Sequence, residues 1–326
     1  MPQILLNEIT KTFRVSERTE KGGLLRGAIV RKTKEIRALD RVCFEIDEGE
    51  LVGYIGPNGA GKSTTVKIMS GILNPDSGQC VIMGRTPWKQ RVAHVAQIGV
   101  VFGQRSQLWW DVPVKDSFSL LKDIYNIPAQ KHKARLERLV GMMDVGDLLK
   151  TPVRQLSLGQ RMRCEVVAAL LHSPKILFLD EPTIGLDAVS KLALRDFLRQ
   201  ENKQNGVTMI LTTHDMDDIE ALCERVMVIG HGRILFDGSL DGLKKQFSPL
   251  RRIRAALQAP VEPFELPGAS KIEFDETACT VWFDPEAVPA QQMLAAMAGQ
   301  IPLKDITIQE QDIDEMIAAM YQVLDL

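Results

Sequence analysis

The segment Gly56–Ser63 constrains this chain more than any other part of its sequence. It reads GPNGAGKS and fits GxxxxGK[ST], with the apolar run Leu51–Ile55 before it and a helical pattern after it. Glycines let a backbone wrap closely around a phosphate group, and the start of a helix favours the same negative charge. The sequence therefore predicts a strand, a phosphate-binding loop and a helix in series.

Each part of this loop has an expected role in nucleotide binding. Lys62 should reach the β- and γ-phosphates, and the hydroxyl of Ser63 should bind Mg²⁺. The alternative is an ordinary glycine turn between strand and helix, but every motif position and both flanks match. The expected nucleotide-binding residues of this segment are Gly56, Pro57, Asn58, Gly59, Ala60, Gly61, Lys62, Ser63 and Thr64.

Two acids follow the apolar run Ile176–Leu179. Asp180 and Glu181 stand where a central parallel strand would end, at the sheet edge where ligands bind. We expect Asp180 to hold Mg²⁺, through water, and Glu181 to polarise the attacking water as general base. Many buried strands end in an acid, so this pattern has weight only beside the complete phosphate-binding loop.

Apolar runs alternate with helical patterns as far as Phe247, which predicts an α/β fold with a mostly parallel sheet covered on both faces. Beyond it, Ser248-Pro249 and further prolines mark a boundary, and residues 248–326 predict a small α+β domain. Strands are expected at 3–8, 41–46, 51–55, 98–102, 176–180, 207–212 and 225–229, and then at 252–257, 271–274, 280–283 and 305–309; helices are expected at 61–72, 188–204, 289–299 and 312–324.

Composition narrows the class of protein. The formal net charge is -2, so no global field recruits nucleic acid, and we expect no nucleic-acid partner. The five cysteines are scattered, without a CxxC pair, which argues against a disulfide framework or a zinc site. Neither an export signal nor a run of about 18 apolar residues is present. If the protein serves a membrane process, another chain must supply the membrane.

The segment Leu156–Gln160 reads LSLGQ and resembles LSGGQ, the signature motif of ABC ATPases, with Leu158 in place of the first glycine. In that family the motif opens a helix whose N-terminus caps the γ-phosphate bound by the opposite subunit. The resemblance therefore implies that Ser157, Gly159 and Gln160 act in trans, by the same anion-binding chemistry of a helix end. Without this context, Ser157 would be a simple N-cap.

Other matches to ABC ATPases follow in the family's order. Gln104 resembles the glutamine that contacts Mg²⁺ and senses the transmembrane partner. The segment Gly185-Leu186-Asp187 resembles the loop that carries signals between the two nucleotide sites. His214 resembles the histidine that contacts the γ-phosphate, although a lone histidine is more often structural. Phe13 is the best choice for the aromatic that stacks on adenine, but the insertion that follows it leaves this assignment open.

The resemblance extends from about Ile4 to Phe247 and implies a P-loop NTPase of ABC type over residues 1–247. Such a domain adds an antiparallel β subdomain and a helical subdomain, here about 105–172, to the mostly parallel sheet. It implies ATP and Mg²⁺ as cofactors, ATP hydrolysis, integral membrane permease subunits as partners and a peripheral place at the cytoplasmic face of the membrane. A second ATPase subunit, either another copy or a relative, would complete the pair.

Within this family the sequence is closest to ATPases of bacterial drug and polysaccharide exporters, as seen in Val100–Phe118 and Arg154–Glu165. Importers share the same catalytic core, so the direction of transport rests on resemblance alone. A soluble ABC ATPase that acts on ribosomes or DNA is the runner-up. The single phosphate-binding loop and the absence of long coiled-coil or zinc insertions argue against it.

Three segments keep two interpretations. The basic insertion, about 14–37, holds eight basic and three acidic residues and is either a solvated excursion or a short amphipathic helix at the membrane surface. Trp109-Trp110 are either core residues or an anchor for the membrane subunit. The C-terminal domain shows no catalytic pattern and is expected to support dimerisation or regulation.

Overall fold

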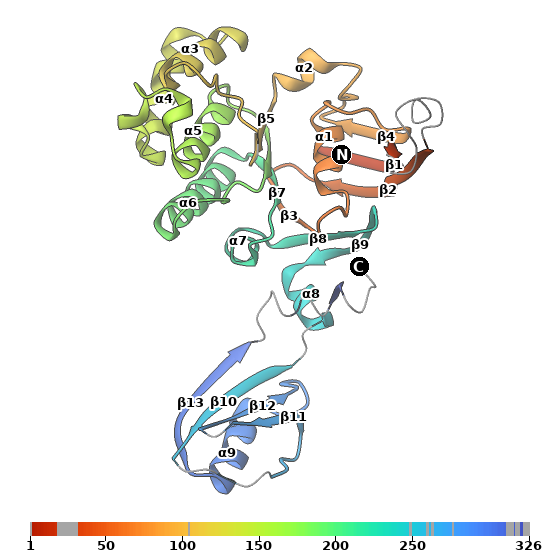
Figure 1. Ribbon diagram of the computed structural model, residues 1–326, viewed down its shortest axis with the longest axis vertical. Coiled ribbons are helices and arrows are strands. Elements are labelled where there is room, and N and C mark those ends of the chain that lie inside the picture. Colours follow the sequence, from red (N-terminus) through yellow and green to blue (C-terminus); the bar gives the residue numbers. More distant parts are fainter. Residues whose placement is uncertain are drawn as a thin grey trace, which may run out of the picture. The chain divides into compact units, whose positions relative to one another are not determined.

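A computed structural model of the chain describes residues 2–17, 32–103, 105–247, 250–258, 261, 264–275, 277–310, 316, 320 and 321. It forms two compact units, Met1–Gly238 and Ser239–Leu326, which are described separately (Figure 1). The units divide at Gly238, nine residues before the expected boundary after Phe247, so helix α8 (Leu240–Phe247) lies in the second unit.

A six-stranded sheet in the order β5-β6-β7-β3-β8-β9 forms the centre of the first unit. Neighbours from β5 to β8 pair in parallel, so their carboxyl ends share one edge, and the predicted mostly parallel α/β sheet is confirmed. Uninterrupted apolar runs suit strands that are buried on both faces. The strands are β3 (Leu51–Ile55), β5 (Ile98–Phe102), β6 (Ile176–Asp180), β7 (Thr208–Thr212), β8 (Arg225–Gly230) and β9 (Arg233–Ser239).

A second sheet, antiparallel and in the order β2-β1-β4, lies beside the first. Helix α1 (Lys62–Met69) contacts both sheets, and its Val66, Ile68 and Met69 belong to a buried cluster shared with strands of each. The helix that follows the phosphate-binding loop is thus fixed between two layers. The strands of this sheet are β1 (Ile4–Glu17), β2 (Lys32–Ile46) and β4 (Ser77–Ile82).

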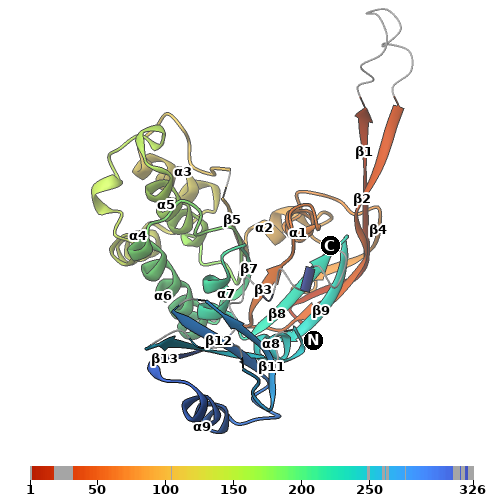
Figure 2. The same cartoon turned by 60° about the horizontal axis from the view of Figure 1, so that its bottom comes forward.

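Strands β1 and β2 are longer than the expected strands 3–8 and 41–46. Their pairing continues through Phe13↔Ile36 to Glu17↔Lys32, past the end of β4 (Figure 2). The outer parts of the basic insertion are therefore strand, with Arg14 and Glu35 joined by a 3.0 Å ion pair. Alternating charges concealed this strand pattern in the sequence. The expected amphipathic helix around Leu24–Val30 lies outside the described residues.

Strands β5 and β6 pair directly, and the chain between them is helical and stands to one side of the six-stranded sheet (Figure 1). The expected helical subdomain, about 105–172, contains α3, α4 and α5. Buried Glu201 on α6 accepts a hydrogen bond from Arg138 of α4 and forms a 3.6 Å ion pair with Arg135 of the same helix. These contacts fasten the subdomain to α6. The helices are α2 (Arg91–Val95), α3 (Val114–Ile124), α4 (Ala129–Met143), η1 (Gly146–Leu148), η2 (Val153–Gln155), α5 (Leu158–Leu170), α6 (Ala188–Asn205) and α7 (Met216–Leu222).

The second unit is an antiparallel sheet with a helix against one face. Its strand order is β11-β12-β10-β13, and its core joins Ile253, Val281 and Phe283 of the sheet to Met293 and Met297 of α9. Among the described residues of the whole chain, we find no helix long and apolar enough to cross a membrane. The elements are β10 (Arg251–Leu257), β11 (Ala269–Phe274), β12 (Ala278–Phe283), α9 (Ala290–Gln300) and β13 (Leu303–Glu310).

Replacing Glu201 tests the link between α4 and α6. Glu201→Gln leaves two partly buried arginines without their carboxylate. Because both arginines keep some contact with water, we expect a loss of about 2 kcal/mol in unfolding free energy, below the roughly 3–5 kcal/mol of a fully buried pair. Urea denaturation measures it. Glu137→Gln, which removes an exposed pair with Lys133, is the control and should cost under about 0.5 kcal/mol; equal losses would contradict the argument.

Acid should weaken the fold through His172. Its ring stacks on Tyr125 at 3.9 Å and its Nε2–H donates to the Ile98 carbonyl at 2.8 Å, and burial lowers its pKa from 6.5 to about 4. The unfolded chain therefore binds this proton first. The contribution of neutral His172 to the free energy of unfolding is complete above pH 6.5. It is lost as the pH falls towards 4, which lowers that free energy by roughly 3 kcal/mol. His172→Gln should flatten the pH dependence of urea unfolding in this window; an unchanged slope would refute the assignment.

Candidate active site at the phosphate-binding loop

Close packing forces the phosphate-binding loop to be glycine-rich. A Cβ on Gly56 would lie 2.2 Å from the carbonyl oxygen of Ile229 on β8. Gly61 has a φ of 116°, and a Cβ there would lie 2.7 Å from the carbonyl oxygen of Ala38 on β2. Side chains at these positions would push the loop away from both sheets. The loop is therefore shaped by its neighbours as well as by its own sequence.

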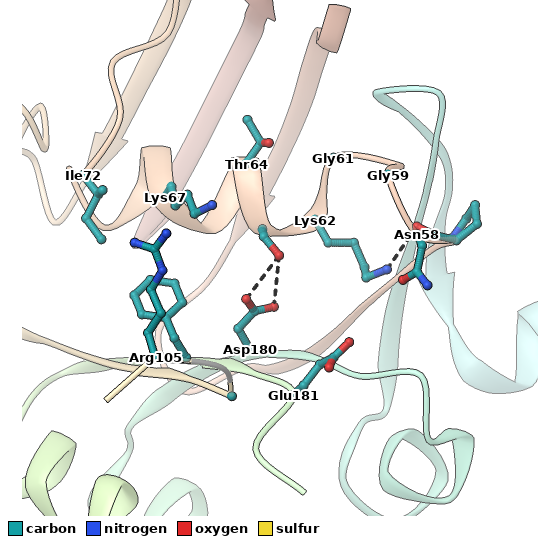
Figure 3. Close-up of a pocket in the computed structure, with 14 residues that line it drawn as sticks. Asn58, Gly59, Gly61, Lys62, Thr64, Lys67, Ile72, Arg105, Asp180 and Glu181 are labelled. Carbon is teal, nitrogen blue, oxygen red and sulfur yellow. Dashed lines mark hydrogen bonds between the residues drawn. The ribbon is translucent and has the colours of Figure 1, made fainter. Parts of the chain in front are cut away.

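A cavity of about 410 Å³ opens beside this loop, within the size range of small-molecule sites (Figure 3). It lies at the carboxyl edge of the parallel strands, where β6 ends at Asp180 and Glu181 follows. Nine of the sequence-predicted residues converge on it. They are Pro57, Asn58, Gly59, Gly61, Lys62, Ser63, Thr64, Asp180 and Glu181.

The ammonium group of Lys62 is folded onto its own loop. It donates to the carbonyl oxygens of Gly56 and Pro57, the latter at 3.1 Å. Figure 3 shows the Lys62 side chain turned back towards Asn58. Burial lowers the pKa of Lys62, while the carboxylates of Glu181 and Asp180 raise it in part. The side chain is 9% exposed. A buried cation beside a cavity is suited to an anionic ligand such as a phosphate group.

Ser63 and Asp180 line the cavity, and buried Thr212 supports Asp180 from behind. The Ser63 hydroxyl donates to Asp180 Oδ2 at 3.2 Å, and the Thr212 hydroxyl from β7 donates to Oδ1 of the same carboxylate. Figure 3 shows the Asp180 carboxylate turned towards the helix that carries Lys62 and Thr64. A hydroxyl and a carboxylate form a hard oxygen donor set, which fits Mg²⁺ held jointly with nucleotide phosphates.

Glu181 has a backbone conformation that non-glycine residues rarely adopt. Its φ is 55°, and its N–H donates to the carbonyl oxygen of Thr212 at 2.8 Å, so a neighbouring strand holds the strained turn in place. The carboxylate lies 3.3 Å from Nδ1 of His214, whose side chain is 72% exposed. Two of the side chains expected to be catalytic are thus brought together, although His214 does not line this cavity.

The residues from the LSLGQ segment lie outside this cavity. Ser157 caps helix α5, where its Oγ accepts from the Gln160 N–H at 3.2 Å and Gln160 Oε1 accepts from the Ser157 N–H at 3.0 Å. Asp187 likewise caps helix α6 by accepting from the Ser190 N–H at 2.8 Å, which lowers the pKa of Asp187. These residues form helix N-termini and do not contact the cavity of their own chain.

Leu158, the departure from the signature pattern, packs on Gly185. A Cβ on Gly185 would lie 2.4 Å from Cδ2 of Leu158. Gly159 is also close, since a Cβ there would lie 3.2 Å from the carbonyl oxygen of Gly185. The start of α5 and the turn before Asp187 therefore touch within one chain, and Leu158 fills the space that the glycine leaves.

Four further predicted residues do not line the cavity or lie outside the described residues. Phe13 lies on β1, is 37% exposed and has Lys11 Nζ 5.8 Å from its ring centroid. It does not line the cavity, so the structure leaves its proposed stacking on adenine as a prediction. Gln104 lies outside the described residues. Gly56 and Ala60 belong to the loop without lining the cavity.

The cavity also contains residues that the sequence did not single out: Lys67, Ile72, Phe102, Gly103 and Arg105. Lys67 stands one helical turn after Ser63, so helical spacing alone was a usable signal for it. Arg105 follows Gln104 directly, and its side chain points along the cavity towards Lys67 and Ile72 (Figure 3). Nothing local marks Ile72, since only the folded chain brings it to this place.

Comparisons with known proteins agree with this geometry. Residues 39–184 match the family described as ABC transporter. The chain is 32% identical over 212 residues to the ABC transporter ATP-binding protein NatA of Bacillus subtilis, covering 65% of this chain and 86% of NatA. It is 33% identical to the daunorubicin resistance ATP-binding protein DrrA3 of Streptomyces coeruleorubidus, over 64% of this chain and 66% of DrrA3. It is 36% identical to the methionine import ATP-binding protein MetN of Geobacillus kaustophilus, over 63% of this chain and 61% of MetN.

Solved structures give the same result. The ATP-binding cassette MJ0796, a dimer bound to ADP and Pi in a post-hydrolysis state, superposes with a TM-score of 0.63 at 26% identity, covering 73% of this chain and 98% of that one. CbiO1 from Clostridium perfringens, part of the ABC transporter complex cbiONQ, has a TM-score of 0.58 at 26% identity, with 73% and 88% covered. These matches agree with the phosphate-binding loop, the paired acids and the helix that begins at LSLGQ. The chain therefore belongs to the ABC transporter family, as one of its ATP-hydrolysing subunits.

Proposed function

We propose that two such subunits close on ATP and, by hydrolysing it, drive export through separate membrane-embedded subunits. One observation carries the proposal: a single cavity brings together a buried lysine, a hydroxyl–carboxylate pair and a strained acid. These are the parts that phosphoryl transfer to water requires, since its catalysis consists mainly of positioning and charge stabilisation. The roles assigned below to individual residues belong to this proposal.

Lys62 and the oxygen donors act on the phosphates. In the proposed cycle the Lys62 ammonium exchanges its two loop carbonyls for the β- and γ-phosphates, while the loop N–H groups and the dipole of α1 attract the same charge. Ser63 and Asp180 are the residues that would hold Mg²⁺. When bound there, Mg²⁺ would neutralise charge that develops on the phosphate oxygens.

Glu181 activates the attacking water in this proposal. Its turn conformation aims the carboxylate at the end of the cavity where the Lys62 side chain lies (Figure 3). Because His214 Nδ1 lies 3.3 Å away, a protonated or N–H-bearing ring can donate to the same carboxylate or to a phosphate oxygen. His214 therefore acts as a polarising group and Glu181 as the base.

A second subunit completes the site. Ser157 and Gly159 form a helix N-terminus that is suited to an anion but lies away from the cavity of its own chain. A head-to-tail pair would place this end of α5 over the γ-phosphate held by the partner. The dimeric MJ0796 structure supports this arrangement, and Asp187, on the turn that touches Gly159, would connect the two sites.

The exposed pair Trp109 and Trp110 is the proposed anchor for the membrane-embedded subunits. The two side chains are 40% and 51% exposed, and the guanidinium of Arg161 lies 5.7 Å from the Trp110 ring. Exposed tryptophans with an adjacent arginine are typical of interface anchors. Similarity to the drug-resistance protein DrrA3 favours export, whereas MetN keeps import as the alternative. Anchoring of this kind places the chain at the cytoplasmic face of the membrane.

Glu181→Gln should separate binding from hydrolysis. Loss of the base lowers kcat by about 10²–10⁴-fold and leaves ATP binding intact, so the closed pair accumulates. A pull-down of this variant from detergent-solubilised native membranes, with ATP present, should recover one or two integral membrane proteins. Ribosomes or DNA-bound proteins without a membrane partner would reject transport and favour the soluble runner-up.

Mixing two inactive variants tests the composite site. In a pair of Lys62→Ala and Ser157→Arg subunits, one site carries both defects and the other carries neither. Random mixing should therefore restore up to about a quarter of the parental ATPase rate, because half of the pairs are mixed and each has one intact site. Lys62→Ala mixed with Glu181→Gln is the control: both defects act in cis, so neither site is intact. No recovery in the first mixture would contradict action in trans.

A further inference from the structure

Glu165 is a buried acid that the proposed catalytic cycle does not use. It lies on α5, about 10 Å along the helix from its first residue Leu158, and is 3% exposed. Within the part of the chain that the structure describes, its carboxylate is held by hydrogen bonds from the neighbouring loop and not by an ion pair. Burial raises the pKa of Glu165, and hydrogen bonds from the neighbouring loop oppose this rise. A carboxylate in such a place costs desolvation energy, so its contacts must offset that cost.

The hydrogen bonds of the Glu165 side chain reach one loop, residues 105–110. Its Oε1 accepts from the hydroxyl of Ser106, and its Oε2 accepts from the Gln107 N–H at 3.1 Å. The side chain of Gln107 donates in return to the backbone carbonyl of Glu165 at 3.0 Å. Hydrogen bonds to an ionised acceptor are about twice as strong as neutral ones. Glu165 therefore fastens two consecutive loop residues to the helix that begins at Ser157.

This loop runs from the active-site cavity to the protein surface. At its first residue, Arg105 lines the cavity (Figure 3), and the Gly103 N–H, just before the loop, donates to the carbonyl oxygen of Asp180 at 2.8 Å. At the other end are Trp109 and Trp110, of which Trp110 also lies near Arg161 of α5. The contacts of Glu165 stand between these two ends. A shift of α5 would therefore displace the loop along with it.

The ordinary alternative is that Glu165 merely satisfies two buried donors. A neutral glutamine could satisfy part of this set without the cost of a buried charge. The position of the acid argues for more, because α5 carries the signature residues at its N-terminus and Glu165 in its middle. Because a helix is stiff and these hydrogen bonds hold the loop to it, a movement of the α5 N-terminus is passed on to the loop.

We propose that Glu165 is a positioning residue that makes α5 and the loop of residues 105–110 move as one body. When ATP draws Ser157 against a partner's phosphate, Glu165 transmits that movement to Trp109 and Trp110. This inference rests on the proposed action of the α5 N-terminus in trans. It adds a specific residue for the communication between nucleotide and membrane surface.

The tryptophan pair supplies the measurement. In a full-length Trp88→Phe, Trp282→Phe parent that also carries Glu181→Gln to retain ATP, only Trp109 and Trp110 emit. Acrylamide quenching is measured with and without ATP and Mg²⁺, beside the thermal midpoint and the ATP dissociation constant. We expect Glu165→Ala and Ser106→Ala to reduce the ATP-dependent change in quenching by about half or more, with ATP affinity within about threefold of the parent.

Rescue and non-additivity separate transmission from simple packing. Glu165→Gln keeps one acceptor oxygen and should give an intermediate change in quenching. The double variant Glu165→Ala, Ser106→Ala should lose no more of the ATP-dependent change than Glu165→Ala alone. If Glu165→Ala does not fold, Ser106→Ala carries the test from the loop side. Folded, ATP-binding variants with the full parental response would overturn the inference, as would a parent that binds ATP without any change in quenching. A parent that fails to bind ATP would instead refute the proposed function, and this inference with it.

Discussion

The close approach of the phosphate-binding loop to two different sheets is the constraint on which the rest of the structure depends. Gly56 leaves no room for a Cβ beside β8, and Gly61 leaves none beside β2, so the turn between β3 and α1 is held from both sides. Helix α1 is thereby fixed between the layers, with Lys62 and Ser63 in its first turn facing β6. The cavity exists because this turn cannot relax towards either sheet.

Strain and polarity are concentrated on the opposite wall of the cavity. Glu181 adopts a left-handed turn directly after Asp180, and hydrogen bonds to Thr212 on β7 stabilise both residues. Hydrogen bonds from a neighbouring parallel strand thus offset the backbone strain of a turn that directs two acids towards the phosphate-binding loop. The same principle recurs on α5, where a buried carboxylate is kept because a loop offers it donors.

Much of the first unit follows from local pattern. Apolar runs followed by polar residues located the central strands, and the glycine spacing located the loop, because strands buried on both faces leave an unbroken signature. The lengths of β1 and β2 did not follow, since Arg14, Glu35 and Lys34 disguise their alternation and only cross-strand pairing shows it. Lys67 was within reach of helical spacing. Ile72 and Arg105 were not, because their place in the cavity depends on how distant segments pack.

The sequence by itself determined the chemistry: a loop that must wrap a phosphate group, an acid pair at a strand end and a helix start suited to an anion. These are short-range features, dictated by glycine conformation, hydrogen-bonding groups and residue spacing. Only the tertiary structure decided which of them share a cavity. It placed Lys62, Ser63, Asp180 and Glu181 together and left Ser157 and Asp187 as helix caps outside. The reason is physical: which side chains meet depends on the order of strands in the sheet and the packing between layers, and neither is encoded in any one segment of the chain.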